Sequence, residues 1–245
     1  MRHTAATVTL VLMTPIGLDA GCWSAMRLPG TEVVRHEFPG FGARDRAPVT
    51  PTMASLADEV AQRYPGPLDL VGVSMGGMVG QNVAVRHPDR VRSLLTACTG
   101  AASDPAVMAQ RAAAAEVGGM EAVLATTLER WFTPAALATP GHPGVDHARR
   151  TLLGLDPRAF ADGWRAIATH DVREELATVR APVTVVAGSA DTASPVARAE
   201  EVAERTPDAR LVVLDGPHMM HLEEPAALSD AIAEHLARAT GRAAA

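Results

Sequence analysis

Short apolar segments and segments with helical periodicity alternate along most of the chain. An uninterrupted apolar run of about four to eight residues is typical of a strand buried on both faces of a parallel sheet. Segments whose apolar residues recur at every third or fourth position are typical of the helices that cross between such strands. The strands predicted in this way span residues 7–13, 32–37, 68–73, 91–97, 183–187 and 210–214, and the helices span residues 55–64, 75–86, 195–206 and 225–239. The alternation predicts an α/β fold built on a mostly parallel sheet.

Residues 100–178 interrupt this alternation after the predicted strand that ends near Ala97. The stretch holds alanine-rich helical segments separated by proline and glycine, and it contains Trp131 and Trp164. Loops and inserted helices over the carboxyl edge of a parallel sheet commonly form the ligand site. We therefore expect a core of residues 1–99 and 179–245, with a helical cap of residues 100–178 inserted into it.

Composition narrows the classes of function. The 245 residues are 47% hydrophobic, which is enough for a sizeable core, but only 3% aromatic, so alanine, valine and leucine must fill most of it. The net charge of −6 and a pI near 5.8 argue against nucleic acid or an anionic membrane as the main partner. All 22 basic residues are arginine. The lack of lysine in the sequence excludes Schiff-base chemistry, a lysine general base and a lysine-containing phosphate loop.

The two cysteines, Cys22 and Cys98, have neither metal-ligand spacing nor the pattern of a disulfide framework. We interpret them as reduced thiols of a cytoplasmic protein, while a disulfide between them stays open. The first residues, with Arg2 ahead of an apolar stretch that leads to Cys22, superficially resemble a lipoprotein signal. The charge of Asp19 and the break at Pro15 favour a buried strand instead. No run approaches the roughly 18–20 apolar residues of a membrane-spanning helix.

The segment Gly72-Val73-Ser74-Met75-Gly76 joins a predicted strand to a predicted helix. A serine at the apex of such a sharp turn is the arrangement called a nucleophile elbow, in which the hydroxyl projects above the sheet. The turn is tight, so side chains at Gly72 and Gly76 would collide with the neighbouring strand and helix. The pentapeptide alone is weak evidence, because the chain has 20 glycines and an ordinary glycine-rich turn is the alternative. Ser74 is therefore a candidate nucleophile that needs support from the rest of the chain.

A serine nucleophile needs a general base and a residue that orients the base. Asp191 and His218 each follow a predicted strand, which places both at the same sheet edge as Ser74. Three candidate residues at one sheet edge are much less expected by chance than a match to one pentapeptide. Asp191 has an alternative role as an ordinary turn aspartate. His221 is an alternative base, but we favour His218 because residues 221–225 are typical of the start of the last helix.

An oxyanion hole at this site needs two backbone amides. Met75, the residue after the candidate nucleophile, is expected to supply one of them. The loop after the first strand is expected to supply the other, and because Pro15 has no amide hydrogen, Ile16 is the natural donor.

These motifs together resemble the α/β-hydrolase superfamily over essentially the whole chain, and they look most similar to the 3-oxoadipate enol-lactonases. The similar segments are the elbow region 70–81 with its continuation 86–91, the cap stretch 119–134, the acid loop 186–191 with Pro195, and the pattern His218-x-x-x-x-Glu223-x-Pro225. The elbow, acid and histidine motifs are specific for the superfamily, whereas the cap stretch is only moderately specific for the lactonases. The resemblance implies a catalytic triad of Ser74, Asp191 and His218.

The chain departs from these relatives in three places. The oxyanion loop reads Thr14-Pro15, where most relatives carry His-Gly and the enol-lactonases carry a pair nearer to Asn-Ser. Arg44 stands where relatives often have serine; its side chain could reach solvent or a substrate, and we favour solvent, with no role at the site. Only six residues precede the first predicted strand, where relatives usually have a strand pair, so we expect a sheet of six strands. We expect the chemistry of the superfamily to carry over better than the substrate.

The resemblance implies a serine hydrolase of a small carboxylic ester or lactone, and an enol-lactone hydrolase in its most specific form. Enol-lactones carry a carboxylate, so Arg130 is a candidate anchor, with Arg149 and Arg150 as alternatives. Trp131 and Trp164 are candidates for lining the pocket, and packing of the cap is their alternative role. We expect a small-molecule substrate and no cofactor, metal, nucleic acid or membrane, and we leave a homodimer open.

Two other functions stay open. The same triad serves carbon–carbon hydrolases, thioesterases and non-hydrolytic lyases or cyclases of biosynthetic pathways. A ligand-binding pseudoenzyme on the same scaffold is the third hypothesis, which an intact triad disfavours. A serine at position 74 argues against haloalkane dehalogenase and epoxide hydrolase chemistry, because both need a carboxylate there.

Overall fold

The computed structural model describes residues 8–28 and 33–241. They form one sheet of six strands in the order β2-β1-β3-β4-β5-β6, and every neighbouring pair is parallel. The strands are β1 (Thr9–Met13), β2 (Val33–His36), β3 (Leu68–Val73), β4 (Val91–Ala97), β5 (Val183–Gly188) and β6 (Ala209–Leu214). The predicted α/β fold with a six-stranded sheet is confirmed.

Helices follow most of the strands and carry the chain back to the start of the next one. The α-helices are α1 (Met53–Arg63), α2 (Met75–Arg86), α3 (Pro105–Trp131), α4 (Pro134–Ala138), α5 (Pro143–Leu153), α6 (Pro157–Ala168), α7 (Val196–Arg205), α8 (Met220–Glu223) and α9 (Pro225–Ala239). The 3₁₀ helices are η1 (Ala20–Trp23), η2 (Pro88–Arg90) and η3 (Glu175–Thr178). Across residues 8–28 and 33–241, no helix has the length and apolar character that crossing a membrane requires.

The predicted bounds agree with the structure most closely around the elbow, where β3, α2 and β4 begin and end at the predicted residues. The first strand is observed from Thr9, and residue 7 lies outside the described residues, as does residue 32 of the second predicted strand. The helix predicted from residue 55 begins earlier, at Met53. The reason is a capping box, in which Thr52 and Ser55 each accept a hydrogen bond from the other's backbone amide.

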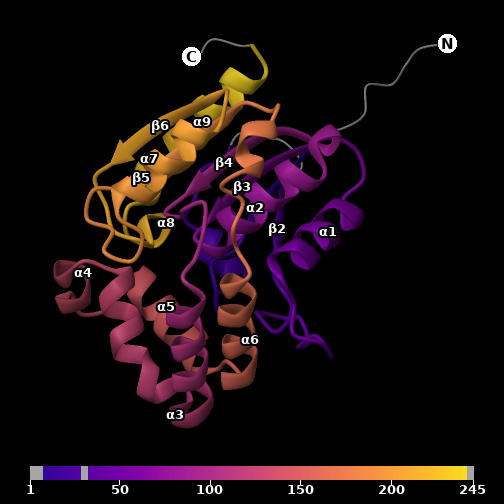
Figure 1. Cartoon of the computed structure of the whole chain (residues 1–245). Helices are drawn as coiled ribbons and strands as arrows, with labels where there is room; N and C mark the ends of the chain where they lie inside the picture. Colours follow the sequence, from indigo (N-terminus) through magenta and orange to yellow (C-terminus); the bar gives the residue numbers. More distant parts are fainter. Residues whose placement is uncertain (1–7, 29–32, 242–245) are drawn as a thin grey trace.

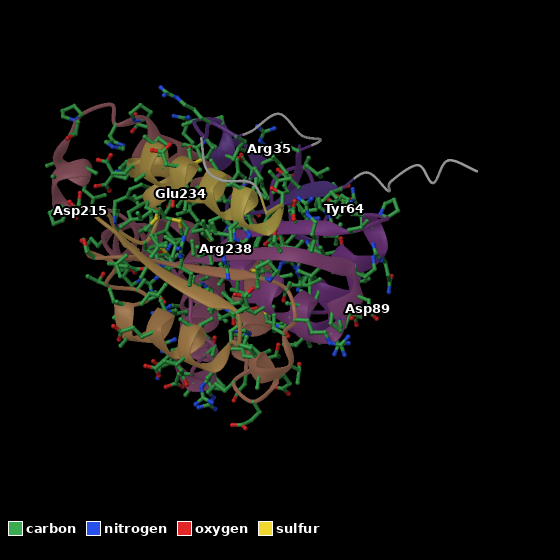
Figure 2. The ribbon with its side chains drawn as sticks, turned by 90° about the horizontal axis from the view of Figure 1, so that it is seen from above. Arg35, Tyr64, Asp89, Asp215, Glu234 and Arg238 are labelled. Carbon is green, nitrogen blue, oxygen red and sulfur yellow. The ribbon has the colours of Figure 1, made fainter. Side chains whose placement is uncertain are left out.

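Helices cover both faces of the sheet. Gln81 of α2 donates to Thr96 of β4, whereas His235 of α9 bonds with Thr184 of β5. Thr96 is paired with Val185, the neighbour of Thr184, and successive side chains of a strand point to opposite faces. The two helices therefore pack on opposite faces, and Figure 2 shows α9, in yellow, along one side of the strands.

The helices α3 to α6 are inserted between β4 and β5, and Figure 1 shows them grouped at one end of the molecule, beyond the strands. The two chain segments that connect this group to the sheet are bonded to each other. Ser103 N donates to His170 O at 2.9 Å, and Val172 N donates to Ala101 O at 2.9 Å. A helical insertion thus stands where the cap was expected, and the division into a core and a cap at residues 100 and 178 stays a prediction.

His170 lies at the base of the inserted helices as a buried, neutral imidazole. Its Nδ1 lies 3.1 Å from Asn82 Nδ2, and its Nε2 lies 3.0 Å from Gly100 O. A carbonyl oxygen only accepts, so Nε2 carries the hydrogen and Nδ1 accepts from Asn82, which also donates to Met78 O. Burial lowers the pKa of His170 from 6.5 to about 4, because the site has no room for solvation of the charged ring.

We expect acid to destabilise the protein partly through His170. The unfolded chain takes up this proton near pH 6.5 and the folded chain only near pH 4, so the unfolded state binds more protons between these values. The free energy of unfolding therefore falls as the pH drops through this window, by about 3 kcal/mol for a shift of this size. Urea unfolding between pH 7 and pH 4 measures the slope, and His170→Gln, which cannot titrate, is expected to flatten it.

Three other buried histidines, His36, His221 and His235, titrate in a similar window and remain in both proteins. Only the difference in slope between wild type and variant therefore reports on His170. An unchanged slope in His170→Gln would show that this histidine is not the acid-sensitive group.

Candidate active site

Ser74 stands at the turn from β3 into α2 with φ of 54° and ψ of −120°. This backbone conformation is unfavourable for a residue that has a Cβ. The glycines around it make the turn tight: a Cβ at Gly72 would lie 2.3 Å from the Gly76 carbonyl carbon, and one at Gly76 would lie 2.2 Å from Met13 O. The predicted steric role of both glycines is confirmed, and it brings the elbow against the end of β1.

Ser74, Asp191 and His218 follow three different strands, β3, β5 and β6, and meet in one chain of hydrogen bonds. His218 Nε2 lies 3.0 Å from Ser74 Oγ, and its Nδ1 lies 2.8 Å from Asp191 Oδ2. All three residues are more than nine-tenths buried. Because a carboxylate only accepts, the Nδ1 hydrogen points to Asp191 and leaves Nε2 free to accept from the serine hydroxyl. The arrangement can therefore withdraw a proton from Ser74.

The carboxylate of Asp191 is itself held in place by the loop after β5. Its Oδ1 accepts hydrogen bonds from the backbone amides of Ala193 and Ser194, both at 2.8 Å. Two hydrogen bonds from backbone amides to Oδ1 fix the plane of the carboxylate, so Oδ2 stays directed at His218. The turn role that the sequence left open for Asp191 and its contact with His218 are thus both present in the structure.

His221, the alternative base, forms no hydrogen bond with the serine hydroxyl. Its ring packs at 5.1 Å from the ring of Trp23, and neither ring nitrogen has a hydrogen-bond partner among the described residues. Burial, with smaller effects from His218 and His147, lowers the pKa of His221 to about 3. A buried neutral imidazole with no partner to orient it cannot serve as the base, so the geometry favours His218.

The two candidate oxyanion donors come from the elbow itself and from the loop after β1. Met75 is the first residue of α2, and Ile16 lines the same pocket as Ser74 and His218. Neither backbone amide donates to another protein group in the part of the chain that the structure describes. The N-terminal end of a helix also carries a partial positive charge. Both amides therefore remain candidates for binding a negatively charged oxygen.

A pocket above Ser74 is lined both by the sheet edge and by the inserted helices. Its enclosed volume is about 50 Å³, and the pocket also opens to solvent. The inserted helices contribute Met108, Arg111, Arg130, Trp131, Trp164 and Ile167. The structure thus places Arg130, Trp131 and Trp164 at the pocket, as the sequence analysis expected of substrate contacts.

Three other arginines singled out from the sequence lie elsewhere. Arg149 and Arg150 are exposed on α5 and do not line the pocket. Arg44 bonds with Glu37 O and with the carboxylate of Glu59, which agrees with the expectation that it has no role at the site.

The sequence analysis missed Arg111 and Arg198, which also line the pocket. Arg111 and Arg130 stand on the two halves of α3, which is interrupted at Gly119, where φ is 73°. A helical wheel drawn through the interruption does not bring them together. Arg198 comes from α7, far along the chain. With 22 arginines in the sequence, no local signal marks these two.

Cys98 lies next to the aspartate and histidine. One ligand atom each from Cys98, Asp191 and His218 lie within 4.8 Å of one another, which is close enough to hold a metal ion. Burial and the charge of Asp191 raise the pKa of the Cys98 thiol, so it stays protonated at neutral pH and is a weak ligand. The other two residues already bond to each other, so the group fits a hydrogen-bonded pair better than a metal centre. Cys98 and Cys22 are both free thiols, so they do not pair.

Comparison with known proteins gives one family and several relatives. The family model described as the Alpha/beta hydrolase family matches residues 10–231. The 3-oxoadipate enol-lactonase 2 of Acinetobacter baylyi is 31% identical over 162 residues, which are 66% of this chain and 60% of that protein. The pimeloyl-[acyl-carrier protein] methyl ester esterase of Aromatoleum aromaticum is 31% identical over 240 residues, covering 89% of this chain and 95% of that protein. The crystal structure of the enol-lactonase from Burkholderia xenovorans LB400 superposes with a TM-score of 0.88 at 27% identity, covering 96% of this chain and 93% of that one.

Proposed function

Because the chain belongs to the alpha/beta hydrolase family, we propose that it hydrolyses a carboxylic ester or lactone through an acyl-enzyme on Ser74. The observation that carries this proposal is the position of His218, whose ring nitrogens lie 3.0 Å from Ser74 Oγ and 2.8 Å from Asp191 Oδ2. The relatives named above support the class of bond, since one is named for an enol-lactone and the other for a methyl ester.

The first half of the reaction transfers the acyl group to the enzyme. His218 Nε2 takes the proton from Ser74 as Oγ attacks the ester carbonyl carbon. The amides of Ile16 and Met75 stabilise the negative charge that develops on the carbonyl oxygen, and each such donor typically contributes about 3–4 kcal/mol. Asp191 holds the ring and stabilises the imidazolium. The bond from the acyl carbon to the alcohol oxygen then breaks, and His218 gives its proton to that oxygen.

The second half releases the acid with water. His218 takes a proton from a water molecule whose oxygen attacks the acyl carbon on Ser74. The same two amides bind the oxyanion again, the bond to Oγ breaks, and the proton returns to Ser74. One water molecule is consumed, and its oxygen ends in the new carboxylate. In a lactone the leaving alcohol stays attached to the acyl chain, so a single ring-opened product results.

We infer that the substrate carries a carboxylate, which Arg130 binds in the pocket, while Trp131 and Trp164 provide apolar contact. Guanidinium groups bind carboxylates with two parallel hydrogen bonds, and a half-buried site strengthens them. 3-Oxoadipate enol-lactone is the first candidate substrate, because it joins an enol ester to a carboxylate. A methyl ester of a dicarboxylic acid is the second, supported by the esterase relative that matches 89% of the chain.

Incubation with 3-oxoadipate enol-lactone or monomethyl glutarate in water enriched in ¹⁸O tests the reaction. We expect one ¹⁸O atom in the new carboxylate, and we expect a fluorophosphonate to label Ser74 in peptide mass spectrometry. A product formed without oxygen from water would favour the lyase or cyclase alternative, and preferred turnover of thioesters would favour a thioesterase. Tight ligand binding without labelling of Ser74 would favour a pseudoenzyme.

A further inference from the structure

Three arginines line the pocket without an acidic partner. Arg111 and Arg130 come from α3 and Arg198 from α7, and all three line the same pocket as Ser74. Among the residues that the structure describes, none of the three forms a salt bridge, and no acidic residue lines this pocket. Elsewhere in the structure arginines are commonly paired, as Arg92 is with Asp69. Unpaired guanidinium groups beside a candidate nucleophile point to an anionic ligand.

The contacts that these arginines do make hold them without neutralising them. The guanidinium carbons of Arg111 and Arg130 lie 4.8 Å and 5.7 Å from the centroid of the Trp164 ring. Arg130 Nε also donates to Thr126 O, and Arg198 donates to Ala102 O, both at 3.2 Å. Each guanidinium has five N–H donors, so most of them are left for a ligand.

The three positive charges also oppose one another. Burial is the main cause that lowers the pKa of Arg130 to about 10, and the charge of Arg111 adds to it. Burial likewise lowers the pKa of Arg111, and the charge of Arg198 adds to that. Arg111 therefore interacts with both of the others. All three are charged at neutral pH, so an anion in the pocket would relieve repulsion that the free protein carries.

We propose that the substrate of this pocket carries at least two free carboxylates in addition to its ester bond. One binds beside Trp164 between Arg111 and Arg130, and the other binds at the exposed mouth between Arg111 and Arg198. The inference rests on the proposed function, since it names the substrate class of the same site. 3-Oxoadipate enol-lactone and monomethyl glutarate each carry one free carboxylate and would leave Arg198 without a counter-charge, so under this inference they test the reaction but are not the natural substrates.

Binding to the Ser74→Ala protein tests this inference separately from the reaction, because the probes stay intact. Dimethyl glutarate has no free carboxylate, monomethyl glutarate has one, and the 1-methyl ester of propane-1,2,3-tricarboxylate adds a second on the same backbone. Calorimetry gives the dissociation constant of each. Each added carboxylate forms charge-assisted hydrogen bonds with an arginine, so we expect each one to lower the dissociation constant by about 10- to 100-fold.

Arg111→Gln in the Ser74→Ala background is the decisive variant, because Arg111 contributes to both carboxylate positions. We expect it to weaken binding of the two-carboxylate ester by about 10- to 100-fold and to leave dimethyl glutarate unchanged. Arg149→Gln, an exposed arginine of α5, is the matched control and should change none of the three constants. If Arg111→Gln does not fold, Arg198→Gln at the exposed mouth tests the second carboxylate alone.

Equal affinity for the one- and two-carboxylate esters would overturn the proposal, as would an equal loss of affinity in Arg149→Gln. The proposed reaction can fail without this inference. If the wild-type protein hydrolyses none of the esters but the Ser74→Ala protein still binds the two-carboxylate ester most tightly, the substrate class is supported and the hydrolytic mechanism is not.

Discussion

We expect Ser74→Ala to lower kcat for ester hydrolysis by about 10⁵- to 10⁶-fold. The substitution removes Oγ, which is both the acyl acceptor and the group that lies 3.0 Å from His218 Nε2. The backbone amides of Ile16 and Met75 and the pocket itself remain, so a residual rate above that in water is expected. Initial rates with monomethyl glutarate, measured at saturating substrate for wild type and variant, give the ratio.

The loss must be one of chemistry and not of folding. Alanine carries a Cβ, as serine does, so both residues are strained to the same degree at the positive φ of position 74. The thermal midpoint of the variant should therefore stay close to the wild-type value. Ser24→Ala, at the exposed end of η1, is the matched control and should keep full activity. Adding His218→Ala to Ser74→Ala should cause little further loss, because the two residues act as one unit. A Ser74→Ala protein that keeps a tenth of wild-type turnover contradicts the acyl-enzyme mechanism.

The elbow was predictable because its backbone is so crowded that only glycine fits at two of its positions. Gly72 and Gly76 are required by contacts of 2.3 Å and 2.2 Å that any Cβ would make with backbone atoms. Backbone atoms cannot move aside as side chains do, so the sequence must place glycine there. Strand, turn and helix follow one another within a few residues, and the chain pattern alone therefore indicated both the fold and the position of Ser74.

The choice between His218 and His221 shows where local reasoning reaches its limit. The two are separated by only a short turn, and their order in the chain says little about which ring faces Ser74. The chain geometry after β6 decides it, since His218 meets Asp191 at 2.8 Å whereas His221 turns into the core against Trp23. The helical pattern after residue 221 favoured the same choice, because a helix directs its first side chains by its own register.

The grouping of Arg111, Arg130 and Arg198 at one pocket could not be predicted from a single sequence. Arg111 and Arg130 are brought to one ring, that of Trp164, by a kink at Gly119 and by packing of α3 against α6. Arg198 reaches the same pocket from α7, on the other side of the insertion. Such proximity depends on how helices from distant parts of the chain pack, which periodicity does not encode. Of these three arginines, sequence reasoning named only Arg130, as one of three candidate anchors for a substrate carboxylate.

The Asp191→Asn variant is expected to lower kcat by about 10⁴-fold while the site keeps its shape. Oδ1 of Asp191 accepts the amides of Ala193 and Ser194, so the oxygen of an asparagine must take that position. The NH₂ group then replaces Oδ2 and donates to His218 Nδ1. The ring must shift its hydrogen to Nε2, which faces Ser74 as a donor and cannot take the hydroxyl proton.

Rates and the tautomer of His218 test this argument together. The ¹⁵N chemical shifts of the labelled ring should show hydrogen on Nδ1 in the wild type and on Nε2 in Asp191→Asn. Asp215→Asn is the matched control, because this exposed aspartate accepts from Ser189 in the neighbouring loop and does not contact His218. A loss of less than tenfold in Asp191→Asn, or a ring that keeps its hydrogen on Nδ1, would mean that the carboxylate does not set the tautomer. In that case Asp191 would serve mainly to close the turn after β5, and His218 would owe its orientation to the packing around it.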